Sequence, residues 1–165
     1  MTIIVVQSFD PVFALFLRKK AERTQKLIII PRANSTPAFF EEAVQAAHQR
    51  TWQEVSILLM HPQSDRPAVE MLVAKLKPLN VKVVDVLSLT QLAEEVATGE
   101  LVITQRYHGG IAALALGVPF MAVPQSEGDK LESLRGLDAV KCGQQVALGE
   151  QALRGALASL ASLRR

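Results

Sequence analysis

The feature that most constrains this chain is an alternation of short apolar runs with longer segments of helical periodicity. The apolar runs are rich in Val, Ile and Leu, as buried strands are, and lie at 2–6, 27–30, 55–60, 81–86, 101–104 and 119–123. Between them, apolar residues recur every three or four positions, which predicts amphipathic helices. Strands that alternate with helices favour right-handed βαβ units. The pattern therefore predicts an α/β fold with a mainly parallel sheet flanked by helices.

Residues typical of helix ends mark where several of these helices begin. The stretch Ser35–Pro37 begins one helix, because the first turn does not need the N–H that Pro lacks. Ser64 or Asp65 is predicted to cap the next helix. Ser88 with Gln91 three residues later forms a capping box for the one after it. These signals separate the helices cleanly from the strands.

The two ends of the chain are less regular. A short apolar segment at 9–17 is predicted to be partly helical after Asp10-Pro11, and residues 1–25 are interpreted as a strand and helix from a boundary between domains. Near the other end, a helix at 109–116 closes at Gly117, and a loop at 124–129 leads to a short helix ending near Gly136. A final helix is predicted from Gly149 to Leu163.

Composition limits the class of protein. The chain has 165 residues, which fits a single domain spanning 1–165. Its net charge is +2 and its basic residues are dispersed, so we expect no nucleic-acid partner. Cys142 is the sole cysteine, which excludes an internal disulfide and a thiolate metal cluster, and we expect no metal site. No apolar run reaches the roughly 20 residues that span a bilayer. We expect a soluble, cytoplasmic protein.

The order of the strands predicts where a ligand binds. The units through residue 86 are expected to extend the sheet to one side of the strand at 27–30, and the strand at 101–104 to return to its other side. Ligands of doubly wound, Rossmann-like sheets bind outside the carboxyl ends of the strands where the winding reverses. The residues that follow these two strands and flank the crevice include Arg32, Asn34, Ser35, Gln105, Arg106, His108, Gly109 and Gly110.

The second of these stretches suggests an anion site. Arg106 offers a planar fork suited to carboxylate or phosphate. His108 can donate a hydrogen bond or a proton near neutral pH. Gly109 and Gly110 stand at a helix N-terminus, where backbone N–H groups are unpaired and a ligand can approach closely. We therefore expect the turn bearing Arg106 and His108 to open onto the crevice as a cationic pocket.

The same stretch resembles a known family. The run Thr104–Gly110, followed by Gly117–Pro119 and then Lys130, is similar to the C-terminal signature of polysaccharide pyruvyl transferases. Upstream, Asp10–Phe13 resembles the segment that enters the second half of those proteins, and Pro62-Gln63 with Asp65 resembles a later polar turn. The resemblance covers the chain from about Asp10 to Leu134.

The resemblance implies a glycosyltransferase-B-like protein of two Rossmann-type halves, of which this chain is the C-terminal one. It implies that phosphoenolpyruvate is the donor substrate and that the pyruvyl group is added to a sugar hydroxyl of a cell-surface polysaccharide precursor. No cofactor is implied. The catalytic residues would be Arg106 and His108, and the substrate-binding residues Arg32, Ser35, Gln105, Gly109, Gly110 and Lys130.

The same architecture implies that activity needs an N-terminal domain. We expect this chain to be part of a longer protein and to be inactive or weakly active by itself, because a site between two halves needs both walls. Whether the chain acts as an enzyme alone is left open, as are the acceptor sugar and the oligomeric state.

Two other functions remain open from the sequence. The chain is also compatible with the nucleotide-sugar-binding half of a glycosyltransferase-B enzyme, in which Glu127 or Asp129 would hold ribose hydroxyls. A non-catalytic binding module of the same fold is the third reading. For single residues, Arg106 is alternatively a structural ion-pair partner, His108 a helix cap, and His61 an ordinary loop histidine. Asp65 is interpreted as a helix cap rather than a ligand-binding residue.

Overall fold

The computed structural model describes residues 8–17 and 21–162, with side chains up to residue 159. The strand predicted at 2–6 lies outside the described residues. Within them, a five-stranded parallel sheet has the order β3-β2-β1-β4-β5. The strands are β1 (Lys26–Ile30), β2 (Glu54–Leu59), β3 (Val81–Asp85), β4 (Leu101–Thr104) and β5 (Phe120–Ala122). The Rossmann-like, doubly wound fold predicted from the sequence is confirmed, including the return of β4 to the far side of β1.

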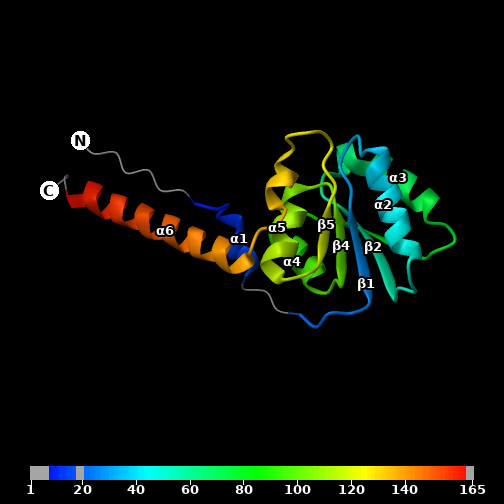
Figure 1. Ribbon diagram of the computed structural model, residues 1–165, viewed down its shortest axis with the longest axis horizontal. Coiled ribbons are helices and arrows are strands. Elements are labelled where there is room, and N and C mark those ends of the chain that lie inside the picture. The colour runs from blue at the N-terminus through cyan, green and yellow to red at the C-terminus, as the bar shows by residue number, and fades with distance from the viewer. Residues whose placement is uncertain (1–7, 18–20, 163–165) are drawn as a thin grey trace.

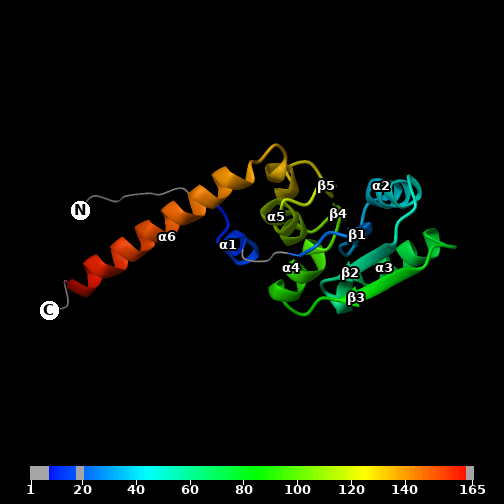
Figure 2. The same ribbon diagram turned by 90° about the horizontal axis from the view of Figure 1, so that it is seen from below.

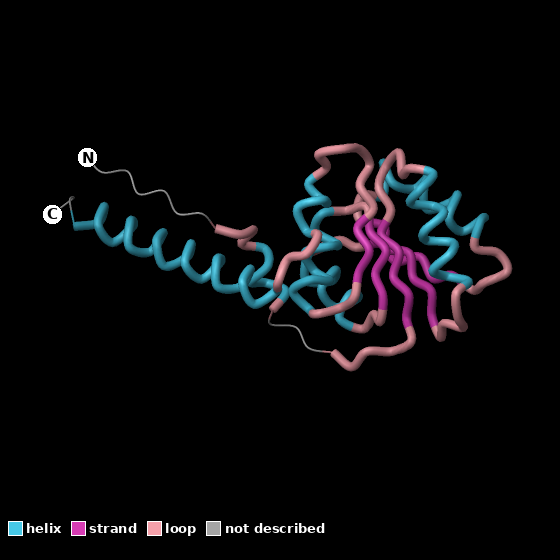
Figure 3. The backbone as a smooth tube through the Cα atoms, viewed as in Figure 1, coloured by secondary structure: helices cyan, strands magenta, loops and turns pink. Residues whose placement is uncertain are grey.

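Helices cover both faces of this sheet, as Figures 1 and 3 show. The helical elements are α1 (Val12–Phe16), α2 (Pro37–His48), α3 (Pro62–Lys75), α4 (Leu89–Ala97), α5 (Tyr107–Leu116), the 3-10 helix η1 (Lys130–Leu134) and α6 (Ala139–Ser162). Because side chains alternate along a strand, Leu27 and Ile29 pack with α2 and α3, whereas Ile28 and Ile30 pack on the opposite face with α1, α4 and α5. Each face therefore carries its own buried core.

Two helix starts differ from the sequence prediction. Helix α6 begins at Ala139, ten residues before the predicted Gly149, because the Asp138 carboxylate accepts hydrogen bonds from the N–H groups of Val140 and Lys141. Gly149 lies inside the helix. Helix α5 begins at Tyr107 rather than at Gly109, with Arg106 as the N-cap residue. His108 consequently belongs to the first turn of α5.

Helix α3 begins at Pro62, so neither Ser64 nor Asp65 is its N-cap residue; that position is His61, whose side chain makes no capping bond. Asp65 instead lies in the first turn and is fully buried. This buried carboxylate lies at the edge of the sheet where the carboxyl ends of the strands meet.

Helix α6 extends away from the sheet and its flanking helices, as the turned view in Figure 2 shows. Its first turns pack near α1 through Cys142 and Val146, while Leu148, Leu153 and Leu157 are exposed. Of the helices described, none combines the length and apolar character needed to cross a membrane.

Backbone hydrogen bonds extend the parallel pairing one residue beyond the central strands. The N–H of Gln105 donates to the carbonyl of Ile30 at 2.9 Å, and the N–H of Val123 donates to the carbonyl of Thr104 at 2.9 Å. The loops after β1, β4 and β5 thus leave the sheet at the same edge. This edge is the reversal crevice that the strand order predicts.

Candidate functional site

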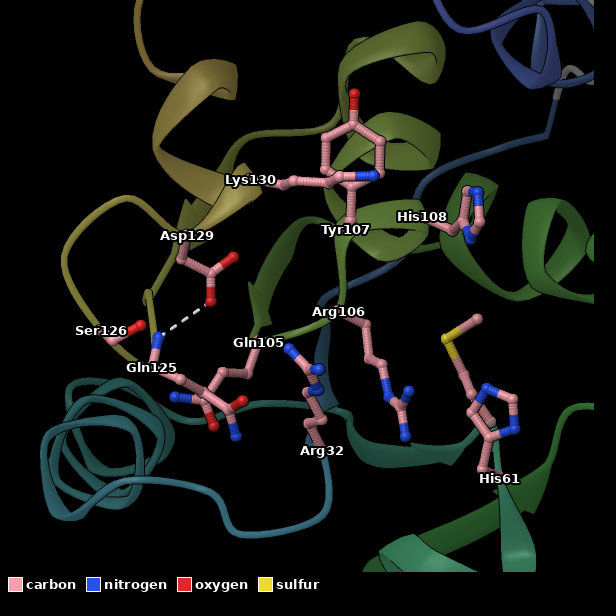
Figure 4. A pocket seen from close by; sticks show the side chains of 11 residues that line it. Arg32, His61, Gln105, Arg106, Tyr107, His108, Gln125, Ser126, Asp129 and Lys130 are labelled. Carbon is pink, nitrogen blue, oxygen red and sulfur yellow. Dashed lines mark hydrogen bonds between the residues drawn. The ribbon is translucent and has the colours of Figure 1, made fainter.

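A cavity of about 580 Å³ opens at the carboxyl ends of the strands. Its lining comes from the loops after β1, β2, β4 and β5 and from the start of η1, as the close view in Figure 4 shows. The lining residues are Arg32, Met60, His61, Gln105, Arg106, Tyr107, His108, Gln125, Ser126, Asp129 and Lys130. Three of these side chains are permanent cations and one is an acid, so the wall itself carries more positive than negative charge.

The structure brings together five of the eight residues predicted for the site. Those that line the cavity are Arg32, Gln105, Arg106, His108 and Lys130. Ser35 does not line it: its hydroxyl donates to the carbonyl of Arg32 at 2.7 Å and accepts from the Arg32 N–H at 3.0 Å. Ser35 therefore holds the turn that carries Arg32.

Gly109 and Gly110 are buried and do not line the cavity. A Cβ on Gly109 would lie 2.7 Å from both Ile30 Cδ1 and Thr104 Oγ1, and one on Gly110 would lie 2.5 Å from Leu134 Cδ1. Their positions therefore give no support to the prediction that these glycines let a ligand approach the backbone. They let α5 pack closely against the sheet and against η1.

Arg106 is held by a buried acid. One terminal nitrogen, Nη2, donates to Asp65 Oδ1, and the Asp65 side chain is fully buried whereas 17% of the Arg106 side chain is exposed. The Nε of Arg106 is buried and has no hydrogen-bond partner among the residues that the structure describes. The Arg106 N–H donates to Thr104 Oγ1 at 3.0 Å, which fixes the backbone at the start of α5. Arg106 is thus both an ion-pair partner and part of the cavity wall.

His108 lies beside a different acid. Its Nε2 is 4.0 Å from Asp10 Oδ2, at the start of α1. In Figure 4 the Arg106 side chain runs toward the region between Arg32 and His61, whereas the His108 ring turns to another side. Arg106 and His108 both line the cavity at the crevice that the sequence predicts, but each has a carboxylate of the chain next to it, so the pocket is less cationic than its sequence suggests. They share the cavity wall without converging on one point.

Two glutamines connect the loops around the cavity. Gln105 Nε2 donates to Thr36 Oγ1 at 3.0 Å, and Gln125 Nε2 donates to the carbonyls of Ala33 and Asn34 at 3.0 and 3.1 Å. The side chain of Gln105 is almost fully buried, and its Oε1 has no hydrogen-bond partner. These bonds tie the loops after β4 and β5 to the loop after β1.

Asp129 connects the loop after β5 to the start of η1, on the part of the cavity wall that these two segments form. Its Oδ2 accepts from the N–H of Gln125 at 3.1 Å and its Oδ1 from the N–H of Leu131 at 3.0 Å. Burial alone would raise the pKa of Asp129, but these two hydrogen bonds, together with the charge of Arg32, outweigh burial and hold the pKa below its ordinary value. The acid is therefore ionised at neutral pH and begins η1.

Lys130 follows Asp129 and lies over the ring of Tyr107, with Nζ 6.0 Å from the ring centroid. Burial, followed by the charge of Asp10, raises the pKa of the Tyr107 hydroxyl, so this phenol is neutral at physiological pH. Lys130 is exposed, and its ammonium remains available to the cavity.

Six residues that line the cavity are not among the predicted catalytic and substrate-binding residues, although Asp129 was a candidate in the nucleotide-sugar alternative. These are Met60, His61, Tyr107, Gln125, Ser126 and Asp129. Met60 and His61 directly follow β2, and Gln125 and Ser126 follow β5. The sequence feature that could have identified them is their position after strands that neighbour β1 and β4 in the sheet. Treating His61 as an ordinary loop residue overlooked that β2 ends at the same edge. Within the described residues, no group of three or more His, Cys, Asp or Glu side chains is placed to hold a metal ion.

The fold and the cavity define a Rossmann-like α/β protein with basic side chains at its reversal crevice, a place where ligands of such sheets commonly bind. The sequence places it more closely. Residues 2–127 match the polysaccharide pyruvyl transferase family, and because this is well over half of the chain, the chain belongs to that family. No curated protein gives a significant match. Asp129 and Lys130 lie just beyond the matched residues, so their place in the cavity rests on the structure.

Proposed function

We propose that this domain binds phosphoenolpyruvate in the cavity at the carboxyl ends of the strands and contributes to its transfer, as a pyruvyl ketal, onto a polysaccharide precursor. The observation that carries the proposal is the gathering of Arg32, Arg106 and Lys130 around one cavity, in a chain that belongs to the polysaccharide pyruvyl transferase family. Phosphoenolpyruvate carries a carboxylate and a phosphate. Both groups match the hydrogen-bonding fork of arginine and the point charge of lysine.

The cavity carries a positive charge that nearby carboxylates partly offset, so we expect a moderate affinity for anions. Asp65 offsets part of the charge of Arg106, and Asp129 part of that of Arg32. Lys130 has no carboxylate within ion-pair distance among the contacts of the described residues. An exposed, unneutralised lysine at the rim is suited to meeting the phosphate first, with the arginines holding the inner end of the molecule.

In the proposed reaction, a sugar hydroxyl oxygen forms a bond to C2 of phosphoenolpyruvate while the C2–C3 π bond opens and C3 takes up a proton from an acid. The proton of that hydroxyl replaces the one that the acid gave up. A second hydroxyl of the same sugar then bonds to C2, and the C2–O bond to phosphate breaks. The products are a pyruvate ketal and inorganic phosphate, the second hydroxyl's proton leaving with phosphate. Cations on the wall stabilise the departing phosphate, and His108, whose ring is partly exposed at the cavity, is the proposed acid for C3.

The acceptor is proposed to enter between this domain and an N-terminal domain of the whole protein. The resemblance of the chain to one half of a two-domain enzyme supports this division. Accordingly, we propose that the 165-residue chain binds phosphoenolpyruvate but forms ketal slowly or not at all without the other half.

A nucleotide-sugar donor has less support. That alternative needs an acid free to accept hydrogen bonds from ribose hydroxyls, and Glu127 does not line the cavity. Asp129 does line it, but both of its carboxylate oxygens already accept backbone N–H bonds. A non-catalytic binding module predicts the same cavity and differs only in chemistry.

Thermal-shift titration of the chain separates these functions. Phosphoenolpyruvate is expected to raise the melting temperature, because a ligand at about 100 times its Kd stabilises the folded state by about 2.7 kcal/mol. UDP and CDP at the same concentrations are expected to have little effect. A larger shift with either nucleotide supports the glycosyltransferase alternative, and no shift with any of the three contradicts a donor site in this domain.

A further inference from the structure

Asp65 is the most completely enclosed acid of the described residues, and its two oxygens meet four donors. Oδ1 accepts from the N–H of Ala33 at 2.9 Å, from the hydroxyl of Ser64 at 3.1 Å and from Nη2 of Arg106. Oδ2 accepts from the N–H of His61 at 3.1 Å. The side chain is fully buried although its only cationic partner, Arg106, is partly exposed. Burying a carboxylate is costly unless its lone pairs are used, and here four donors use them.

Three of the four partners of Asp65 come from three separate loops, and the fourth, Ser64, lies in α3 itself. Ala33 belongs to the loop after β1, His61 to the loop after β2, and Arg106 to the loop after β4. These loops follow three neighbouring strands of the sheet, and each contributes a residue to the cavity wall: Arg32, His61 and Arg106. One carboxylate therefore connects three loops that form the wall of the cavity.

Helix capping does not account for this arrangement. The bond from the His61 N–H to Oδ2 serves the start of α3, and for that purpose one oxygen is sufficient. Oδ1 points to two other loops that α3 does not need. In addition, the bond to Asp65 restricts a guanidinium that has no partner at Nε among the described residues, and Thr104 bonds only the backbone of Arg106. Without Asp65, packing alone would set the direction of the guanidinium.

We infer that Asp65 is a positioning residue for the anion site: it fixes the Arg106 guanidinium against the cavity and holds the loops after β1, β2 and β4 in register. The inference rests on the proposed function for the identity of the anion, but the contact with Arg106 does not depend on it. Asp65 itself is not expected to touch the substrate. Its carboxylate would repel phosphate and carboxylate, and it lies behind Arg106 outside the cavity lining.

Two variants test this role. Asp65→Asn keeps the size and one acceptor oxygen but removes the charge and replaces the acceptor that faces the His61 N–H with a donor. Asp65→Glu keeps the charge and moves the carboxylate by one methylene. The matched control is Glu95→Gln, because Glu95 pairs with the buried Lys26 at 2.7 Å at the opposite edge of the sheet. Circular dichroism identifies which variants are folded at the temperature of the measurements.

Two readouts are taken on the folded variants. The first is hydrogen exchange of the Arg106 Nε–H in ¹H–¹⁵N spectra, with the signal assigned by its loss in Arg106→Lys. The second is the Kd for phosphoenolpyruvate by calorimetry. In folded Asp65→Asn we expect faster exchange at Nε and a Kd raised by about tenfold or more, as expected when one partner of a buried charge pair is lost. Asp65→Glu should change both quantities in the same direction, because it moves the acceptor that holds Arg106. Glu95→Gln should change neither quantity.

The outcomes separate the two proposals. A Kd within about twofold of the parent protein, or unchanged Nε exchange, in a folded Asp65 variant overturns the positioning role. A purely structural role would lower the melting temperature while leaving both readouts unchanged well below it. If the parent chain itself fails to bind phosphoenolpyruvate, the proposed donor is wrong, and the Nε exchange still decides whether Asp65 positions Arg106.

Discussion

The two edges of the sheet each bury one member of an ion pair, but they bury opposite charges. At the amino ends of the strands the buried group is a cation: Lys26, the first residue of β1, contacts Glu54 at 3.0 Å and Glu95 at 2.7 Å. At the carboxyl ends the buried group is an acid, Asp65, and the cation Arg106 forms part of a cavity wall.

This difference indicates what each pair is for. The side chains of Glu54 and Glu95 are 40% and 21% exposed, so water solvates part of their charge. Their ion pairs with Lys26 stabilise this end of the sheet. A hydrogen bond from the Ser56 hydroxyl outweighs burial and, with Lys26, holds the pKa of Glu54 below its ordinary value. At the carboxyl edge the charge that reaches the cavity is the positive guanidinium of Arg106, and the buried Asp65 behind it holds it in place. A buried acid behind a partly exposed arginine fits the anion site that we propose.

Loss of the arginine should have the largest effect. Arg106→Ala is expected to lower the free energy of unfolding by about 3–5 kcal/mol, because it leaves the fully buried Asp65 without its cation. Lys26→Ala should cost less, because its two acids can turn to water. Urea denaturation of both variants checks the order. Equal losses would mean that the two edges do not differ as described.

Glycine packing at the start of α5 gives the next largest effect. Gly109→Ala is expected to cost about 1–3 kcal/mol, because its Cβ would meet Thr104 Oγ1, which bonds the backbone of Arg106 and cannot easily move. Gly110→Ala should cost less than about 1 kcal/mol, since it meets only the end of the flexible Leu134 side chain and alanine favours a helix. Thermal unfolding of the two variants makes the comparison. A harmless Gly109→Ala would reopen a ligand-related role for this glycine.

The turn that carries Arg32 should be more tolerant. Ser35→Ala removes two hydrogen bonds between the Ser35 hydroxyl and the Arg32 backbone. We expect a loss of about 0.5–1.5 kcal/mol in stability and a weaker affinity for phosphoenolpyruvate. Chemical denaturation and calorimetry on the same preparation measure both. An affinity that is unchanged while stability falls would remove Arg32 from the site.

The smallest effect concerns Asp129 and appears only in acid. Its folded-state pKa lies below the ordinary value of 3.8, so the unfolded chain binds more protons there and stability rises with pH. The contribution is fully present above 3.8 and is lost as pH falls through the folded-state pKa. Asp129→Asn should therefore show a flatter stability curve across this window.

Urea midpoints at a series of acidic pH values test this prediction, and Glu54→Gln serves as the comparison at the opposite edge, where the pKa is also lowered. If Asp129→Asn follows the parent curve in acid, the hydrogen bonds from Gln125 and Leu131 do not favour the charged form.

Much of the fold was predictable because it depends on local pattern. Apolar runs of four to six residues mark the strands, and the return of the 101–104 strand to the far side of β1 follows from the connections between them. The gathering of Arg32 and Arg106 was predictable for the same reason, since both follow strands that turned out to be neighbours. Position after a strand end is visible in a sequence.

The rest depends on distances between segments remote in the chain. Asp65 looks like a helix cap in the sequence, and nothing local reveals that it contacts Ala33 and Arg106, 32 and 41 residues away. Gly109 looks like a ligand-approach glycine until Ile30 and Thr104 are seen against it. The early start of α6 was missed because Gly149 appeared to limit the helix, whereas Asp138 caps it eleven residues before.

The central claim is that the carboxyl edge, and not the amino edge, is an anion site. Calorimetric titration of phosphoenolpyruvate into the parent chain, Arg106→Met and Lys26→Met tests it most directly, since both substitutions remove one buried-pair cation and keep an apolar side chain. The account predicts binding by the parent and by Lys26→Met, and its loss in Arg106→Met. Undiminished binding by folded Arg106→Met, or loss of binding in Lys26→Met alone, would contradict it.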